Sequence, residues 1–314
     1  MINNIVSVII PTYNGSQKIA ATLDEIFVQS YQNIEVIVVD DNGLGTEEQM
    51  KTAEVLKRYP TVHYYAHEVN KNGSAARNTG IQHSTGDFLA FLDDDDTWME
   101  NKIENQVGVL QSLSSEWGAV YCPYIEIESM EEAYFKAGGK QGEILFEYLI
   151  EDVKIASSTI MIRREVLEKV HGFDESFRRH QDWEFIDRIA AQYKIAFTNQ
   201  TLTFKHNETR RNSPKKLDTL IENRLYYLEK MQSVIGQLPS DKQQQVYSYH
   251  YSFLAKECLR RKKFVQCFKW LCKSGHPVIN GTGLVKDVFF YMKKKKNTQS
   301  CECIVERWQA GLNR

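Results

Sequence analysis

Residues 5–14 read IVSVIIPTYN, an apolar run that ends at Pro11, and residues 34–42 read IEVIVVDDN. Both runs are apolar at consecutive positions, which is typical of strands covered on both faces of a parallel sheet. Four apolar residues recur at helical spacing between the two runs: Ile19, Leu23, Ile26 and Phe27. We therefore predict a βαβ unit at the start of an α/β domain with a mostly parallel sheet.

Polar clusters follow three of the predicted strands. Thr12–Asn14 follow the first run, Asp40–Asn42 follow the second, and Asp93–Asp96 follow an apolar strand over residues 88–92. Open α/β sheets bind their ligands outside the carboxyl ends of the strands. We expect the three clusters to meet at this edge and to form the site.

The formal charge changes sign along the chain. Residues 1–212 carry 20 Lys and Arg against 33 Asp and Glu, whereas residues 213–314 carry 19 against 8, and together these give the net charge of −2. The second part contains an apolar helical stripe: Leu217, Leu220, Ile221, Leu225, Leu228 and Met231. The length of 314 residues favours two modules. We predict a ligand-binding domain over residues 1–212 and a basic helical region over residues 213–314.

Cysteine usage and the N-terminus predict a cytoplasmic protein. The 6 Cys lack the paired spacing of a zinc site or a disulfide scaffold, which fits a reducing compartment. No apolar run reaches the roughly 18 residues of a membrane span, and residues 1–11 lack signal-peptide features.

The run Asp93–Asp96 is the most specific chemical feature. Neighbouring carboxylates repel each other unless a cation joins them, and hard oxygen ligands favour Mg²⁺ or Mn²⁺ over Zn²⁺. Such an ion usually completes its shell with substrate phosphates. The alternative is an N-cap and acidic first turn of the following helix.

Two further segments have both a binding and a structural interpretation. Asp40 and Asp41 can accept hydrogen bonds from a ribose or a base, or they can belong to a turn. Residues 73–78 open a helix with small residues and place Arg77 one turn in, where it can meet an anion. No Walker loop and no G-x-G-x-x-G motif follows the first strand, which weighs against kinase-type and nicotinamide-binding proteins.

Later in the chain, Asp182 stands at a predicted helix start, where it can act as a general base or as an N-cap. His206 offers a nitrogen ligand for a metal, and Arg210 and Arg211 offer two cations suited to a diphosphate. A lone histidine is more often a packed or surface residue.

Together these segments resemble the family-two inverting glycosyltransferases, which have the A-type nucleotide-sugar-binding fold, a Rossmann-like α/β fold. The resemblance covers roughly residues 5–213 and includes both the order and the spacing of the motifs. It rests on six segments: Val8–Asn14, Val38–Asp41, Ala76–Gly80, Phe91–Asp96, Gly172–Asp174 and Gln181–Glu184.

The resemblance implies a role for each matching residue. Residues implied to bind the nucleotide sugar are Pro11, Thr12, Tyr13, Asn14, Asp40, Asp41, Arg77, Asp93, Asp94, Arg210, Arg211 and Ser213. Asp95, with Asp93 and His206, is implied to bind Mn²⁺ or Mg²⁺, and Asp182 is implied to be the catalytic base. Gln181 replaces a frequent Glu, which bears on acceptor choice, and residues 42–43 replace a common Gly-Ser.

The implied reaction is metal-dependent, inverting transfer of a hexosyl or N-acetylhexosaminyl group in bacterial surface-polysaccharide synthesis. The donor is expected to be a nucleoside-diphosphate sugar, with UDP as the favoured nucleotide, and the acceptor a hydroxyl of a glycan or lipid-linked glycan; no nucleic acid partner is expected. Two alternatives remain: a nucleotidyltransferase that makes the sugar nucleotide, and a non-catalytic sugar-nucleotide-binding protein.

The end of the chain suggests a second partner. Lys293–Lys296 follow an apolar helical face, and Arg260–Lys263 add to the basic charge. The apolar face consists of Leu284, Val285, Val288, Phe289 and Met292. This combination is typical of a helix on an anionic membrane, peripheral on the inner face of the cell membrane, or of a core-packing helix with a solvated basic end.

Overall fold

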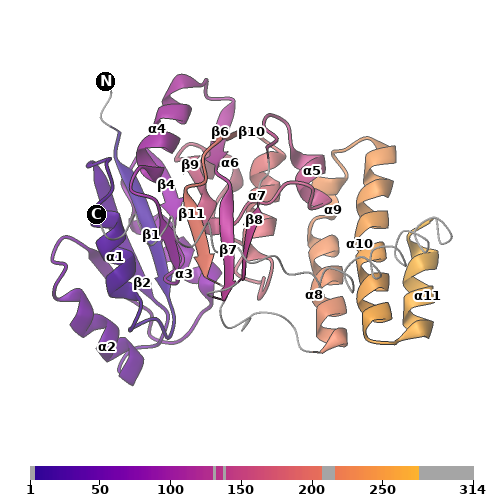
Figure 1. Cartoon of the computed structure of the whole chain (residues 1–314), viewed down its shortest axis with the longest axis horizontal. Helices are drawn as coiled ribbons and strands as arrows, with labels where there is room; N and C mark the ends of the chain where they lie inside the picture. The colour runs from indigo at the N-terminus through magenta and orange to yellow at the C-terminus, as the bar shows by residue number, and fades with distance from the viewer. Residues whose placement is uncertain (1–3, 130–131, 137–138, 207–215, 276–314) are drawn as a thin grey trace. The chain divides into compact units, whose positions relative to one another are not determined.

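The computed structural model describes residues 4–129, 132–136, 139–206 and 216–275. Figure 1 labels their helices and strands. The first half contains β1 (Val6–Thr12), α1 (Ile19–Phe27), β2 (Ile34–Asp40), α2 (Glu47–Leu56), β3 (His63–Ala66), α3 (Gly73–His83), β4 (Phe88–Phe91), β5 (Asp96–Trp98), α4 (Lys102–Ser112), β6 (Trp117–Tyr121), β7 (Tyr124–Ser129) and β8 (Glu132–Lys136). The second half contains α5 (Leu145–Leu149), the 3₁₀ turn η1 (Ser157–Thr159), β9 (Ile160–Arg163), α6 (Val166–Val170), α7 (Gln181–Ala190), β10 (Lys194–Phe197), β11 (Thr203–His206), α8 (Leu217–Lys230), α9 (Gln232–Ile235), α10 (Ser240–Arg260) and α11 (Phe264–Lys273).

The chain divides into two compact units. Within the described ranges, the first unit, here called the sheet unit, holds residues 4–127, 134–136, 139–148 and 152–206; the second, the helical unit, holds residues 128–129, 132–133, 149–151 and 216–275. The predicted helical region after the α/β domain is confirmed, whereas the predicted boundary at residue 212 falls among residues 207–215, outside the described part of the chain. No helix of the described ranges is both long and apolar enough to cross a membrane.

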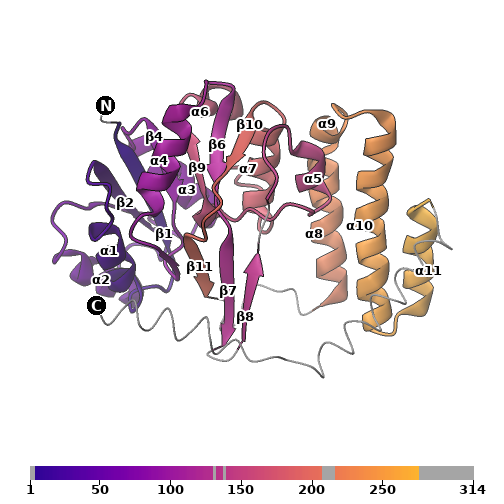
Figure 2. The same cartoon turned by 45° about the horizontal axis from the view of Figure 1, so that its top comes forward.

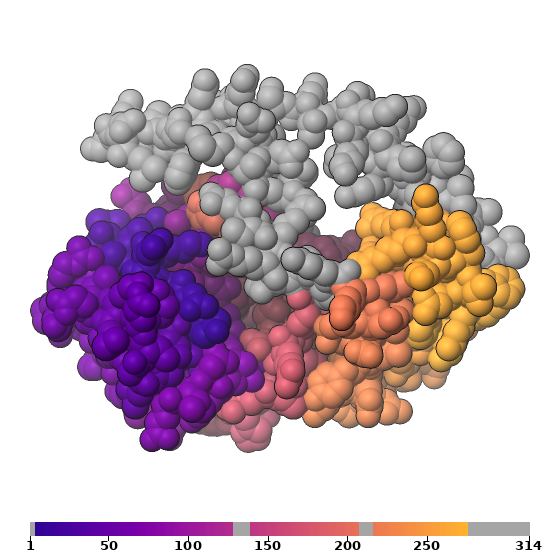
Figure 3. Space-filling view, turned by 90° about the horizontal axis from the view of Figure 1, so that it is seen from below, coloured from indigo at the N-terminus to yellow at the C-terminus, as the bar shows by residue number. Residues whose placement is uncertain are grey.

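In the helical unit, α8, α10 and α11 lie side by side (Figures 1 and 2), and Figure 3 draws their surface in orange to yellow. A small apolar core joins α10 to α11, with Leu254, Cys258 and Trp270 buried in it. A buried polar cluster lies beside this core: Arg224 donates to Glu151 Oε1 at 2.7 Å and to His250 Nδ1 at 2.9 Å. Because Nδ1 accepts this bond, the ring donates from Nε2, which lies 3.0 Å from the carbonyl of Leu149.

The sheet unit is built on a seven-stranded sheet with the order β10-β6-β9-β4-β1-β2-β3. The neighbours β4, β1, β2 and β3 are parallel, as the apolar runs predict, and β10 is parallel to β6. The exception is β9, which runs antiparallel to both β4 and β6. The sequence pattern of residues 157–162 predicts a strand, but Ser157–Thr159 form a 3₁₀ turn and the strand β9 begins only at Ile160.

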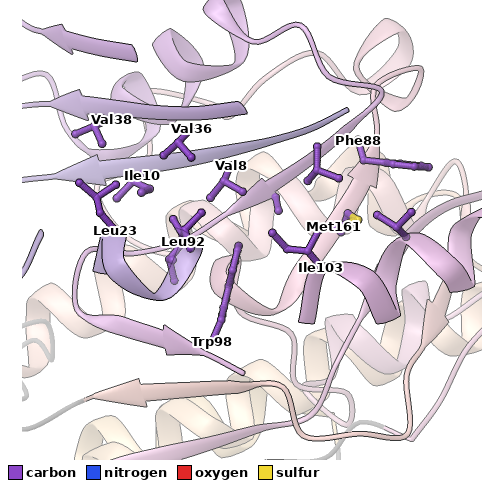
Figure 4. Close-up of a cluster of buried hydrophobic side chains, with 14 of the residues drawn as sticks. Val8, Ile10, Leu23, Val36, Val38, Phe88, Leu92, Trp98, Ile103 and Met161 are labelled. Carbon is purple, nitrogen blue, oxygen red and sulfur yellow. The ribbon is translucent and has the colours of Figure 1, made fainter. Parts of the chain in front are cut away.

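The core of the sheet unit lies on both faces of the central strands. On one face, Val8 and Ile10 of β1 pack with Leu23, Trp98 and Ile103 among other buried side chains (Figure 4). On the other face, α3 approaches β1 so closely that a Cβ at Gly80 would lie 2.3 Å from Cγ2 of Ile9. Only glycine allows this distance, which explains why helix α3 carries one in its middle despite the lower helix propensity.

The register of the sheet gathers the polar strand ends. Thr12 of β1 pairs with Asp40 of β2, so the two residues that end these strands lie next to each other. Phe91, the last residue of β4, pairs with Ile9 of β1, and the aspartate run begins two residues later, at Asp93. The predicted meeting of the polar clusters at one edge is therefore observed.

A second sheet of four strands, β5-β11-β7-β8, extends this edge. Residues 203–206 form β11, which pairs antiparallel with β5 so that Lys205 lies opposite Asp96. The polar character of residues 125–142 predicted no strand there, and no pattern predicted a strand over residues 203–206. The strand β11 brings residues distant in sequence against the aspartate run.

Candidate active site

The aspartate run connects β4 to β5, and protein cations already bind two of its carboxylates. Asp93 accepts from Arg77 Nη2 at 2.5 Å and lies 3.6 Å from Lys205 Nζ. Asp96 is buried and accepts from Lys205 Nζ at 2.6 Å and from Ser158 Oγ at 2.5 Å. The argument that uncompensated repulsion in the run demands a metal is therefore wrong for these two residues, since Arg77 and Lys205 supply the positive charge.

Burial and the neighbouring cations shift the pKa values of Asp93 and Asp96 in opposite directions. Burial opposes the charge of Asp93, but Arg77 and Lys205 hold the pKa of that carboxyl below its usual value. Burial dominates at Asp96 and raises its pKa, although Lys205 opposes the shift. The pKa of Lys205 is raised because the attraction of Asp96 and Asp93 outweighs its burial. Lys205 therefore remains a cation that holds the aspartate turn to β11.

Asp94 points back to the end of β1. Its Oδ2 accepts from Thr12 Oγ1 at 2.5 Å, and burial raises the pKa of this carboxyl to about 7, against the effect of the Thr12 hydrogen bond. A Cβ at Gly15 would lie 1.8 Å from Asp94 Oδ2. Gly15 is therefore required for the approach of Asp94 to β1.

Asp95 is the most open member of the run. Its side chain is 43% exposed, and the ammonium of Lys18 lies 3.8 Å from Oδ2. Because an exposed ion pair of this length is weak, the carboxylate can exchange it for a stronger cation. Of the four aspartates, Asp95 is the one whose oxygen atoms a metal ion can reach most easily.

Asp182 lies in the first turn of α7 and is half-buried. Its pKa is raised, chiefly by burial and further by the charge of Asp93, while Arg77 and Lys205 act in the opposite direction. The start of α7 lies at the same site as the aspartate run, since Arg77 contacts both Gln181 and Asp93. A carboxylate with a raised pKa binds a proton more readily, as a general base requires.

Arg77 connects the two acidic elements. It donates to Asp93 and, over 3.3 Å, to Gln181 Oε1, the residue before Asp182. A Cβ at Gly73 would lie 3.1 Å from both Arg77 Nη1 and Gln181 Oε1, so the first residue of α3 leaves room for this contact. The predicted anion-binding arginine is thus held by carboxylate and amide oxygens.

Asp40 has hydrogen bonds that match the turn interpretation. Its Oδ1 accepts from the backbone N of Asn42 at 2.9 Å and from Asn42 Nδ2 at 2.8 Å, while Oδ2 accepts from the hydroxyl of Tyr64 at 2.9 Å. The residue is fully buried. Its predicted contact with a nucleotide stays a prediction and would require these bonds to be shared.

Asp41 is also buried, and it fixes the start of α3. It accepts from the backbone N of Lys71 at 2.7 Å and of Asn72 at 2.8 Å. The side chain of Asn72 then accepts from the first turn of α3 and caps the helix. Asp41 thus holds the loop before the helix that carries Arg77, and its predicted role in nucleotide binding remains a prediction.

The remaining predicted residues lie around this edge. Pro11 is half-buried, whereas Tyr13 is exposed and Asn14 has a positive φ of 55° and donates its N–H to Asn42 Oδ1. In β11, Nε2 of His206 lies 3.3 Å from Thr97 Oγ1. Three predicted residues fall outside the described part of the chain: Arg210, Arg211 and Ser213.

Sequence reasoning missed three contributors to the site. Lys205 precedes His206 and gave no motif of its own, and Ser157 and Ser158 lie in a stretch predicted as a strand. Ser157 donates to Asp93 at 3.2 Å, and Ser158 donates to Asp96. Their only sequence signal is polarity within otherwise apolar segments.

The available carboxylate oxygen atoms suit a hard divalent cation that is bound by only a few protein ligands. Within the described ranges, no three His, Cys, Asp or Glu side chains surround a common point. Mg²⁺ and Mn²⁺ sites often use only one or two carboxylates together with water and substrate phosphates. The exposed Asp95 satisfies this requirement.

Comparison with known proteins agrees with the α/β fold. The glycosyl transferase family 2 model matches residues 7–171, more than half of the chain. The chain belongs to glycosyltransferase family 2 and is accordingly a glycosyltransferase. It is 33% identical to the amylovoran biosynthesis glycosyltransferase AmsB of Erwinia amylovora over 72% of this chain and 77% of AmsB.

A second relative has a more detailed name. The UDP-Glc:alpha-D-GlcNAc-diphosphoundecaprenol beta-1,3-glucosyltransferase WfgD of Escherichia coli is 30% identical over 52% of this chain and 62% of its own length.

Solved structures share the fold. TarS 1–349 of S. aureus in complex with UDP-GlcNAc has a TM-score of 0.64 and 16% identity, over 85% of this chain and 79% of that chain; a longer TarS chain is matched over 43% of its length. The mannosyltransferase PcManGT of Pyrobaculum calidifontis, in complex with GDP-Man and Mn²⁺, has a TM-score of 0.59 and 17% identity, over 92% and 81%. The predicted A-type fold class is confirmed.

Proposed function

We propose that this chain transfers a sugar from a nucleoside-diphosphate sugar, with UDP as the nucleotide, to a hydroxyl of a glycan or lipid-linked acceptor, with inversion at the anomeric carbon. The observation that carries the proposal is the convergence of Asp182 with the aspartate run, through Arg77 and Lys205. The names of AmsB and WfgD support a role in the synthesis of a polysaccharide or of a lipid-linked glycan.

In the proposed reaction, Asp182 accepts the proton of the acceptor hydroxyl while that oxygen attacks the anomeric carbon. The raised pKa of Asp182 favours this proton transfer, and the half-buried position keeps the carboxylate reachable. A single displacement from the face opposite the leaving group inverts the anomeric centre. Arg77, held by Asp93, presents a guanidinium to the same site and lowers the cost of negative charge on the leaving diphosphate.

Asp95 is proposed as the direct ligand of Mn²⁺ or Mg²⁺, with Asp93 and His206 as further ligands. A bound ion would supply Lewis-acid stabilisation of the departing nucleoside diphosphate. The exposure of Asp95 supports its role, whereas Asp93 would have to share its carboxylate with Arg77. Arg210, Arg211 and Ser213 are proposed to bind the diphosphate as well.

The proposal is tested by donor turnover without an added acceptor. The full chain is incubated with UDP-, GDP- and dTDP-sugars in Mn²⁺, Mg²⁺ or EDTA, and release of nucleoside diphosphate is measured. We expect release from a UDP-sugar that EDTA abolishes, and NMR at early times should detect the inverted anomer of the free sugar.

Three outcomes would contradict parts of the proposal. Exchange of pyrophosphate into the donor would indicate a nucleotidyltransferase. Tight donor binding without any turnover would indicate a non-catalytic binding protein. Retained anomeric configuration would require a nucleophile other than the acceptor oxygen.

A further inference from the structure

Helix α11 is apolar on two faces, and one of them is open to solvent. Cys267 and Trp270 are buried in the core that α11 shares with α10. On the other side, Phe264, Val265 and Phe268 are 65%, 87% and 67% exposed. Their spacing of i, i+1 and i+4 places them on one face of the helix. Three large apolar side chains exposed within five residues form a patch that indicates an interaction surface rather than scattered exposure.

Basic residues border this open face. Arg260–Lys263 precede it, and Lys269 and Lys273 follow on the adjacent side of the helix. Between residues 256 and 275 the one acidic residue is Glu257, which forms an ion pair with Arg260 at 2.6 Å. Lys262 and Lys263, by contrast, are exposed beside Phe264. The surface thus combines apolar side chains with excess positive charge.

The turn before α11 contains a lysine where glycine is favoured. Lys263 N donates to the carbonyl of Cys258 and Lys262 N to that of Leu259, the two bonds of a Schellman C-cap. Lys262 occupies the left-handed position of this motif, with φ of 59°. A lysine there costs backbone energy relative to glycine. Its presence is therefore not explained by the stability of the turn.

A solvent-open hollow of about 630 Å³ adjoins the same turn. Its lining comes from the start of α8 and from the turn: Lys216, Leu217, Asp218, Lys262, Lys263, Phe264, Val265 and Gln266. Figure 3 draws this end of the helical unit in orange and yellow. Three lysines face one aspartate here, so the hollow suits an anionic group next to apolar chains.

We propose that Lys262, Lys263, Phe264, Val265, Phe268 and Lys269 form a docking face for the surface of an anionic lipid bilayer. The two phenylalanines and the valine enter the interface between headgroups and acyl chains, and the lysines lie at the level of the lipid phosphates. Charge complementarity selects this occupant, because a cytoplasmic leaflet rich in anionic lipids attracts clustered lysines. The proposal does not depend on the donor, the metal or the base of the reaction.

The test is vesicle co-flotation of the full chain, with phosphatidylcholine vesicles and with vesicles that contain phosphatidylglycerol. All variants carry Ala at Lys293–Lys296, so that the terminal lysines do not contribute. Phe264→Ser/Val265→Ser/Phe268→Ser and, separately, Lys262→Glu/Lys263→Glu should each lower binding to the anionic vesicles by at least about tenfold. The control is Val28→Ser/Met50→Ser, which removes exposed apolar side chains from the sheet unit and should leave binding unchanged.

Lys262→Gly separates the binding role from a structural one. Glycine suits the left-handed turn, so this variant should keep or raise the melting temperature while it lowers binding to anionic vesicles.

Two results would overturn the proposal. The first is that the triple serine variant binds anionic vesicles as strongly as its parent does. If light scattering then detects a lower oligomeric mass for this variant, the face belongs to a contact with a second copy of the chain; an unchanged mass overturns the proposal equally. The second is equal binding of the parent to neutral and anionic vesicles.

Discussion

Two charged clusters, one in each unit of this molecule, differ in how their charge is balanced. In the sheet unit, Asp93 and Asp96 are bound by Arg77 and Lys205, which come from other elements of the chain. In the helical unit, Lys262 and Lys263 are adjacent in the sequence, and both are exposed to solvent. Buried charges must be neutralised by the fold itself, whereas exposed charges are solvated and remain available to a partner. Substitutions in the two regions should therefore have separable effects.

The largest expected effect comes from Asp182→Asn. The amide keeps the shape of the side chain but cannot accept the proton, so transfer should fall by about 10³-fold. Affinity for UDP with Mn²⁺, measured by calorimetry, and vesicle binding should both stay near the parent values. Glu47→Gln, which neutralises an acid in the first turn of α2, controls for effects on a helix start. Transfer within tenfold of the parent would mean that another residue is the base.

The next largest effect is expected for Asp95, the carboxylate that is most exposed to solvent. Asp95→Ala should weaken UDP binding in Mn²⁺ by roughly a hundredfold, because a direct metal ligand is lost. In EDTA the parent and the variant should bind UDP equally. Glu100→Gln, an exposed acid shortly after the run, serves as the matched control. If Asp95→Ala bound UDP like the parent in Mn²⁺, the metal would have to be held elsewhere.

Lys205→Gln tests whether the fold neutralises its own aspartates. Removal of the cation should destabilise the protein by about 2 kcal/mol at pH 8, since Asp96 then remains buried without its counter-charge. The pKa of Asp96 is raised, so protonation below its folded value restores stability and the deficit should shrink as the pH falls. Lys205→Arg keeps the positive charge and should lose less stability than Lys205→Gln.

Thermal unfolding of both variants across pH would check the prediction for Lys205. An equal loss at every pH would indicate a packing role instead of a charge role. In the helical unit, by contrast, Lys262→Glu/Lys263→Glu should leave the pH profile of stability unchanged.

The smallest effect concerns Asp94. Its folded pKa of about 7 lies above the unfolded value, so its contribution to stability is present at low pH and is lost as the pH rises through 7. Asp94→Asn keeps an oxygen atom that accepts from Thr12, but the amide does not ionise, so the loss of stability at high pH disappears. In the absence of nucleotide and metal, the variant should be more stable than the parent at pH 8 and equal to it near pH 4. A constant difference would contradict the raised pKa.

Much of the fold was predictable from local patterns. The apolar runs of β1 and β2 and the helical spacing between them identified the βαβ unit, and the stripe from Leu217 to Met231 identified α8. The direction of β9 and the strand at residues 203–206 were not predictable in this way. Strand pairing depends on partners far away in the sequence, and short strands of four residues carry little periodicity.

The candidate site was partly predictable for the same reason. Asp93–Asp96 and Asp182 were found because their residue types and neighbours form motifs, but what binds each carboxylate could not be inferred. The sequence treated the four aspartates as one cluster, whereas the structure gives each a different environment: Arg77 for Asp93, Thr12 for Asp94, solvent and the distant ammonium of Lys18 for Asp95, and Lys205 for Asp96.

The amino-acid sequence by itself determined the α/β class, the edge of the sheet at which the polar residues gather, and the basic character of the last third of the chain. These properties depend on periodicity, composition and strand ends, which are local. Only the tertiary structure decided which carboxylates are neutralised and which are open, because a salt bridge between Lys205 and Asp96 joins residues 109 positions apart. It also decided which face of α11 remains exposed, since both faces are apolar and packing against α10 covers only one.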